Sequence, residues 1–180
     1  MSKRVNNYEL MDNPNENNQL CNDFMKISSI STGFVDLPGK TTLNIFVQGC
    51  KLHCNGCQNT DLLSFDGGSV VFLSDIEETL KKRTLSTWIC WLGGDATYQP
   101  DGFKEFNKFF KSKNYGVCLY TGRYFSEVRD LLDDVDVIID GPWEGVSVTD
   151  ETSNQGVRFK RGNVWFETTW NKLKGKIEEI

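Results

Sequence analysis

The sequence contains only one histidine and four prolines, and it has no uninterrupted run of about 20 apolar residues that could span a bilayer. It has no apolar N-terminal stretch of the signal-peptide type. The lysines and arginines are scattered, and the formal net charge is −5, so the chain has no basic block that could release counterions from a phosphate backbone. These absences predict a cytoplasmic protein that binds neither membranes nor nucleic acid.

The composition predicts a folded domain with an aromatic core. Hydrophobic residues make up 38% of the 180 residues and aromatic residues 12%, including twelve phenylalanines and five tryptophans. We expect one domain over residues 25–170, because no linker or internal repeat divides the chain. Residues 1–24 are rich in asparagine and acidic residues, which predicts a mobile extension, and the charged residues 171–180 are expected to be peripheral.

Strand and helix patterns alternate along most of the chain. Strands are expected at 43–47, 70–72, 87–92, 117–120 and 135–139, and helices at 75–83, 102–112 and about 125–132. Two further strands, 157–159 and 164–166, are spaced as a hairpin. Such alternation is typical of parallel βαβ units. The predicted fold class is therefore α/β with mainly parallel strands, in the form of an incomplete (β/α) barrel, because 180 residues are few for a complete one.

Three of the six cysteines lie close together directly after the first strong strand. Cys50, Cys54 and Cys57 have the spacing C-x3-C-x2-C, so their thiolates can reach one inorganic cluster from one short loop. A fully protein-bound 4Fe-4S cluster normally has four ligands. Three ligands without an equally close fourth indicate a cluster with one iron that is open to a small molecule.

A zinc site is the alternative interpretation of the same cysteines. Structural zinc prefers four closed ligands, and the fourth could be His53 or one of the distant residues Cys21, Cys90 and Cys118. His53 is awkward in this role because it adjoins Cys54. Cys90 and Cys118 sit in apolar strand patterns, where a small buried residue is the more common role. A zinc-stabilised binding module without catalysis remains an alternative hypothesis.

Several segments, taken in order, resemble one protein family. The segment 35–42 (VDLPGKTT), the strand and cysteine loop over 44–57, and the shorter segments 93–95, 119–122, 135–141 and 153–155 carry the resemblance. Together they resemble the activating proteins of anaerobic ribonucleoside-triphosphate reductases. These are radical S-adenosylmethionine (SAM) enzymes that activate glycyl-radical enzymes.

The resemblance implies a fold, cofactors, a reaction and partners. The fold would be the incomplete barrel of the radical SAM type, and Cys50, Cys54 and Cys57 would hold a 4Fe-4S cluster. SAM on the fourth iron would be reductively cleaved, and the resulting 5′-deoxyadenosyl radical would take hydrogen from a glycine of the reductase large subunit. An unidentified one-electron donor would complete the reaction.

Two strand ends are the predicted SAM contacts. Ligands of parallel α/β folds bind at the carboxyl ends of strands, and residues 93–95 also resemble the family segment that receives the SAM amino group. The predicted contacts are Gly93, Gly94, Asp95, Tyr120, Thr121 and Gly122. Trp143 could belong to a docking face for the reductase or to the core, and the sequence leaves the role of Arg158 open.

A second enzymatic hypothesis keeps the cofactors and changes the substrate. A small-molecule radical SAM enzyme resembling 7-carboxy-7-deazaguanine synthase would also have a shortened fold. The sequence therefore predicts the cluster more narrowly than it predicts the substrate.

Overall fold

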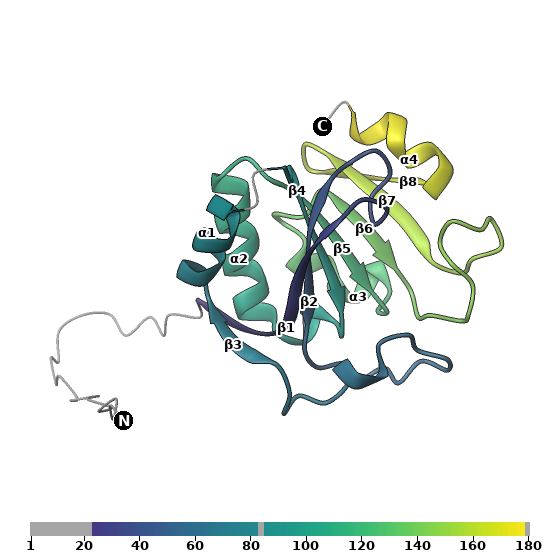
Figure 1. The fold of residues 1–180 in the computed structure, drawn as a ribbon. Helices are drawn as coiled ribbons and strands as arrows, with labels where there is room; N and C mark the ends of the chain where they lie inside the picture. The colour runs from purple at the N-terminus through teal and green to yellow at the C-terminus, as the bar shows by residue number, and fades with distance from the viewer. Residues whose placement is uncertain (1–22, 83–84, 179–180) are drawn as a thin grey trace, which may run out of the picture.

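The computed structural model describes residues 23–82 and 85–178, which form one mixed sheet with helices on both faces (Figure 1). The strands are β1 (Phe24–Gly33), β2 (Thr42–Val47), β3 (Ser69–Phe72), β4 (Trp88–Gly93), β5 (Gly116–Thr121), β6 (Val137–Asp140), β7 (Gly156–Arg161) and β8 (Val164–Thr168). The predicted extension over 1–24 lies outside the described residues except for its last two, and Phe24 already begins β1.

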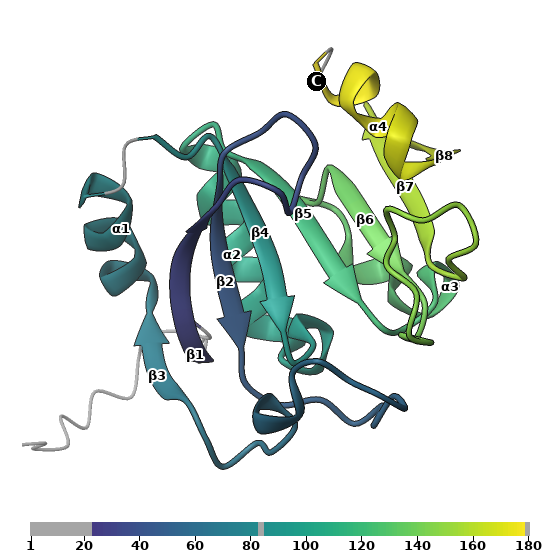
Figure 2. The same ribbon diagram turned by 45° about the vertical axis from the view of Figure 1, so that its right-hand side comes forward.

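The centre of the sheet is parallel and its flanks are antiparallel. The strand order is β3-β1-β2-β4-β5-β6-β7-β8, with parallel pairing from β2 through β4 and β5 to β6. Strands β1, β3, β7 and β8 pair antiparallel. The predicted α/β class and parallel central strands are confirmed, and the flanks make the sheet a mixed one. The four central strands point toward the same end of the molecule (Figure 2).

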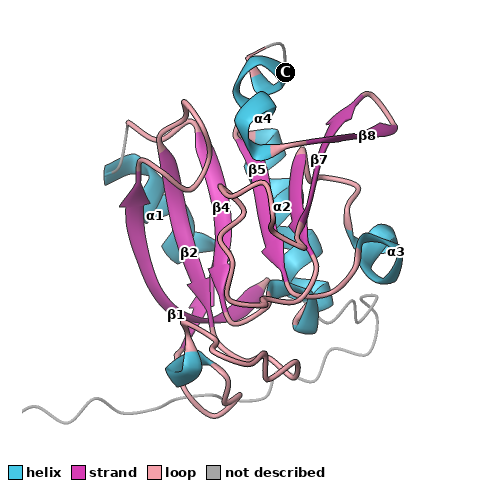
Figure 3. Ribbon diagram, turned by 90° about the vertical axis from the view of Figure 1, so that its right-hand side faces the viewer, coloured by secondary structure: helices cyan, strands magenta, loops and turns pink. Residues whose placement is uncertain are grey.

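Helices α1 (Leu73–Lys82) and α2 (Pro100–Ser112) cover one face of the sheet (Figure 3). Trp91 on β4 lies at the centre of this core, and the rings of Phe103, Phe106 and Phe110 surround it at centroid distances of 5.5–6.1 Å. Its indole Nε1 donates a hydrogen bond to Asn107 Oδ1 at 2.7 Å. The helix expected at 102–112 is thus confirmed, and three of its phenylalanines are buried against β4. No helix in the described ranges is long and apolar enough to cross a membrane.

The opposite face of the sheet is covered by helix α4 (Trp170–Ile177) and by the loop between β1 and β2. Leu173 and Ile177 of α4 are fully buried there, together with Leu37 of the loop. The short helix α3 (Phe125–Val128) follows β5 and precedes β6 in the chain, and its Val128 belongs to the core around Trp91. Of residues 171–178, which were expected at the periphery, Leu173 and Ile177 therefore belong to the core of this face, and the others are exposed.

Candidate iron-sulfur and cofactor site

The cysteine loop begins where the central strand β2 ends. Two main-chain hydrogen bonds close its base, from Gly49 N to Leu62 O at 2.8 Å and from Cys50 N to Leu63 O at 3.0 Å. Cys50 is buried, Cys54 and Cys57 are half-buried, and all three are free thiols. In Figure 2 this loop lies beyond the arrowheads of the parallel strands, the edge at which parallel α/β folds bind ligands.

A cavity of about 430 Å³ opens beside this loop. Its wall includes the three cysteines and five of the six predicted SAM contacts, namely Gly93, Gly94, Tyr120, Thr121 and Gly122. The volume lies within the range of small-molecule sites. The structure therefore brings together thiols and strand ends that are separated by up to about 70 residues in the sequence.

Asp95, the sixth predicted contact, lies below the cavity wall rather than on it. Its side chain is buried, and Oδ1 accepts hydrogen bonds from Thr97 N at 3.0 Å and Thr97 Oγ1 at 2.7 Å. Oδ2 accepts from Thr121 Oγ1 at 2.7 Å and Gly122 N at 3.2 Å. Burial raises the pKa of the Asp95 carboxyl, and the hydrogen bonds from Thr121 and Thr97 oppose the rise. Asp95 thus ties the end of β4 to the end of β5.

Two of the predicted glycine contacts make room for the cysteine loop itself. A Cβ on Gly94 would lie 2.5 Å from Gly49 O, and a Cβ on Gly122 would lie 2.5 Å from Leu52 Cδ1. Gly94 excludes a side chain because the Gly49 main chain lies against it, whereas at Gly122 the neighbouring atom is the end of the flexible Leu52 side chain, which can move. Both glycines also line the cavity, and their contact with SAM stays a prediction.

The donor set of this loop fits an iron-sulfur cluster. Cysteine thiolates are the ligands of 4Fe-4S clusters, and three of them face one cavity from a single loop. Within the described residues, no three His, Cys, Asp or Glu side chains are arranged around a single metal ion. A 4Fe-4S cluster does not require such convergence, since each thiolate binds a different iron.

The electrostatic environment of Cys50 follows from its burial at the base of the loop. Burial raises the pKa of its thiol, a hydrogen bond from Leu52 N lowers it, and the nearby Asp95 carboxylate adds to the rise. Iron binding to this side chain must therefore displace a proton.

Three of the further zinc ligands considered from the sequence, His53, Cys90 and Cys118, do not line this cavity. Cys90 and Cys118 are fully buried register partners on β4 and β5, on the face covered by α4. Their predicted role as core residues is confirmed. His53 is exposed, with φ 49°, and Cys21 lies outside the described residues.

Further residues line the cavity, and the sequence predicted no cofactor contact for them. They are Val35 and Asp36 before β2, Leu52, Gln58, Asn59 and Leu63 around the cysteines, Leu92 on β4, Trp143, Ser147, Val148, Thr149 and Gln155 between β6 and β7, and Trp170 on α4. Val35, Asp36 and Gln155 stand in the family-like segments 35–42 and 153–155, which were usable signals, and Trp143 was a candidate for a docking face or the core. The stretch 141–155 carries no helical or strand period, so only the folded chain brings it to the cysteines.

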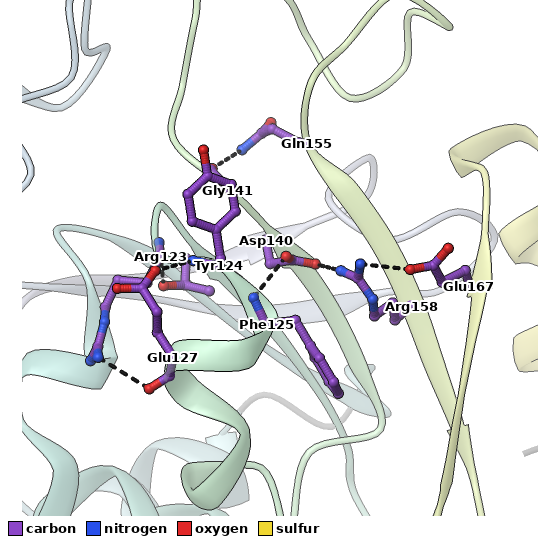
Figure 4. Close-up of polar contacts among 10 residues, drawn as sticks. Arg123, Tyr124, Phe125, Glu127, Asp140, Gly141, Gln155, Arg158 and Glu167 are labelled. Atoms are coloured by element: carbon purple, nitrogen blue, oxygen red, sulfur yellow. Dashed lines mark hydrogen bonds and ion pairs between the residues drawn. The ribbon is translucent and has the colours of Figure 1, made fainter.

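The base of the loop between β6 and β7 is held by a partly buried ion pair (Figure 4). Arg158 Nη1 donates to Asp140 Oδ1, and Arg158 Nη2 donates to Glu167 Oε1 at 2.8 Å. Asp140 Oδ2 also accepts from Phe125 N at 2.9 Å. Arg158 and Asp140 therefore fix the strand ends from which the cavity-lining loop starts and to which it returns.

Comparison with known proteins points to iron-sulfur chemistry. The family model described as a 4Fe-4S single cluster domain matches residues 35–161. The chain is 32% identical over 123 residues to the anaerobic ribonucleoside-triphosphate reductase-activating protein of Enterobacteria phage T4, covering 62% of this chain and 76% of that protein. It is 29% identical over 124 residues to the pyruvate formate-lyase-activating enzyme of Clostridium pasteurianum, covering 63% of this chain and 50% of that enzyme. The chain thus spans about half the length of the clostridial enzyme.

A structural comparison adds one solved protein. The crystal structure of QueE from Escherichia coli aligns with a TM-score of 0.45 and 12% sequence identity, covering 55% of this chain and 53% of that one.

Proposed function

We propose that this chain, which belongs to the 4Fe-4S single cluster domain family and to the radical SAM activases of glycyl-radical enzymes, generates a glycyl radical on an anaerobic ribonucleotide reductase. Its cofactors are a 4Fe-4S cluster and SAM. One observation carries the proposal: three free thiols of one loop share a cavity with the ends of β4 and β5, in a chain related to activases.

The residues of the chain have separate proposed roles. Cys50, Cys54 and Cys57 would bind three irons and leave the fourth for SAM. The segments Gly93–Gly94 and Tyr120–Gly122 would form the wall against which SAM lies. Asp95 would orient that wall from below through its four hydrogen bonds rather than touch SAM.

A 4Fe-4S cluster held by Cys50, Cys54 and Cys57 would supply the one-electron reduction of SAM from which radical chemistry at the target glycine starts. The electron would come from a separate one-electron donor. The chain contributes binding and orientation. Leu52, Leu63 and Leu92 are apolar parts of the cavity wall that would limit the access of water.

The residues at the mouth of the cavity favour a protein as the substrate. Phe34 and Val35 are 70% and 81% exposed, and Val35 belongs to the cavity wall. Large apolar side chains exposed beside a functional cavity are typical of surfaces that bind another protein. A glycine on an exposed segment of the reductase would reach the cavity from this side.

The choice of target enzyme follows from the two relatives. The chain covers three quarters of the phage reductase-activating protein but only half of the pyruvate formate-lyase-activating enzyme, at similar identity. We therefore propose a reductase as the target and a pyruvate formate-lyase as the second candidate.

The proposal extends to the architecture. The twisted sheet with its parallel centre would correspond to an incomplete barrel of the radical SAM type, whose open side admits the partner. Residues 25–170 would form the radical SAM domain.

The test combines the reconstituted chain, SAM, a reductant and the large subunit of the reductase, which is used either unlabelled or with deuterium on the α-carbon of its target glycine. With the unlabelled reductase we expect a glycyl-radical doublet in electron paramagnetic resonance (EPR). With the deuterated reductase we expect deuterium in 5′-deoxyadenosine and collapse of the doublet, and Cys54→Ala should abolish both the radical and the transfer. Parallel reactions contain a pyruvate formate-lyase or a small heterocyclic substrate. A radical on neither protein, with 5′-deoxyadenosine formed from SAM only when the heterocycle is present to donate the hydrogen atom, would refute the activase proposal. One tightly bound zinc without iron would refute the cluster as well.

A further inference from the structure

The tip of the cysteine loop is held mainly by short-range contacts. Cys57 N donates to Cys54 O at 3.2 Å, and Leu52 N lies 3.5 Å from Cys50 Sγ. Lys51 Nζ lies over the rings of Phe65 and Tyr98, and Leu52 packs on Gly122, so the distant packing contacts of the tip belong to its first half. Asn55 and Gly56, between the last two cysteines, are exposed. Exposed residues with few distant partners are expected to open locally more easily than the sheet below them.

One hydrogen bond reaches this tip from a distant part of the chain. Trp143 Nε1 donates to Gly56 O at 3.1 Å, across 87 residues of sequence. Gly56 stands between Cys54 and Cys57, so its carbonyl belongs to the turn that sets the separation of these two thiols. Within the described part of the chain, it is the hydrogen bond that connects the segment 51–58 to a residue far away in the sequence.

Trp143 itself stands on a fixed base. Gln155 Nε2 donates to Gly141 O at 3.2 Å, as Figure 4 shows, and Asn154 Nδ2 donates to Pro142 O at 2.8 Å. These bonds join the two ends of the loop 141–155 directly beside Trp143. The indole is therefore attached to the rigid ends of β6 and β7 and not to a free loop tip.

The loop that carries Trp143 is also a wall of the cavity. Ser147, Val148, Thr149 and Gln155 line it together with Trp143, Cys54 and Cys57. A displacement of this wall by a bound molecule would pass through the indole to the turn between the two cysteines.

We infer that Trp143 is a positioning residue for the cluster, which fixes Cys54 and Cys57 through its hydrogen bond to Gly56 and links them to the cavity wall. The inference rests on the proposed role of these cysteines as cluster ligands. Trp143 touches neither iron nor substrate in this role. It acts by reducing the freedom of the cysteine turn.

The decisive variant is Trp143→Phe, which keeps an aromatic ring and removes the N–H. The matched control is Trp165→Phe, because Trp165 packs on Phe125 at 5.5 Å on the far strand β8. Amide hydrogen exchange of residues 51–58 is measured in the anaerobic full-length chain, both metal-free and iron-loaded. The loss of one hydrogen bond should speed exchange of the Cys57 amide by roughly 2- to 12-fold in Trp143→Phe and leave it unchanged in the control.

Two readouts on the iron-loaded chain separate positioning from general stability. Iron release to a chelator should accelerate by a similar factor in Trp143→Phe, and the change that SAM causes in the EPR spectrum of the reduced cluster should become smaller or broader. The thermal midpoint should remain close to that of the wild type.

Wild-type exchange, iron release and EPR response in Trp143→Phe would overturn the inference. If the wild-type chain assembles no 4Fe-4S cluster, the proposed function fails instead, and exchange in the metal-free chain still decides whether Trp143 restrains the turn.

Discussion

Replacing Asp95 by asparagine tests whether one buried carboxylate aligns the two strand ends of the site. Asparagine keeps one acceptor oxygen, so it can serve either Thr97 or the pair Thr121 and Gly122, but not both sides as the carboxylate does. The other pair of donors would face an amide NH₂ group. Asp95→Asn should therefore separate the ends of β4 and β5 without removing volume from the core.

The magnitude follows from the hydrogen bonds that are lost. Losing a hydrogen bond to a charged group costs about 1.5–3 kcal/mol, and the two threonine hydroxyls can rotate toward other partners, so we count one net loss. The removal of a buried charge offsets part of this cost, since burial raises the pKa of Asp95. For a chain of this length, a loss of about 1.5–3 kcal/mol lowers the melting temperature by roughly 3–12 °C.

The assay is thermal and urea unfolding of Asp95→Asn beside Asp133→Asn, because Asp133 is exposed and its substitution should change stability by less than about 0.5 kcal/mol. SAM binding to the iron-loaded proteins is measured in parallel. We expect Asp95→Asn to retain iron and to bind SAM more weakly. Wild-type stability together with wild-type SAM affinity would refute the role of Asp95 as the tie between β4 and β5.

Two further predictions concern Gly94 and the buried thiol of Cys90. Gly94→Val should lower both stability and iron content, because its side chain would displace the Gly49 carbonyl at the base of the cysteine loop. Iron analysis and urea unfolding measure the two effects, and a variant with full iron content and lost SAM affinity would contradict the prediction. Burial raises the pKa of Cys90 well above its unfolded value of about 8.5, so its contribution to stability is complete below about pH 8.5 and is lost as the pH rises toward the folded-state pKa. Urea midpoints of the reduced protein should therefore decline between about pH 8.5 and 10, and less steeply in Cys90→Ala; equal slopes would contradict the assignment.

Most of the sheet could be predicted because its central strands are short apolar runs between turns. β2, β4, β5 and β6 lie within one or two residues of their predicted positions. Strand β1 was missed for a physical reason. A register shift between Ile27 and Ser29 interrupts its alternation, so Met25, Ile27 and Ile30 do not follow a period of two.

Helix α4 was missed because its signal is weak in isolation. Only Trp170, Leu173 and Ile177 mark its apolar face, Gly175 interrupts it, and the remaining residues are polar or charged. Its packing against the second face of the sheet stabilises it, and that packing depends on residues more than 100 positions earlier, such as Leu37.

The candidate site shows the same division. The cysteines were visible from spacing, and the strand ends from the position of ligands in parallel sheets. The role of Asp95 below the wall was not visible, because a motif gives residue types without the direction of the side chains. The role of Trp143 could not be assigned, since its partner is a main-chain carbonyl 87 residues away. Every residue has such a carbonyl, so the sequence does not show which one accepts the hydrogen bond.

The position of the cysteine loop in the strand order has a consequence for how the protein is made. Cys57 is synthesised 98 residues before Gln155, which belongs to the last loop that walls the cavity. At about 5–20 residues per second, the ribosome needs roughly 5–20 s for that interval. During it β4, β5 and finally the loop 141–155 are synthesised one after another, so the three thiols exist before the walls of the cavity are complete. Cluster insertion into its final site is therefore a step that follows translation of most of the chain, and a translating ribosome exposes these cysteines to oxidants before the fold can shield them.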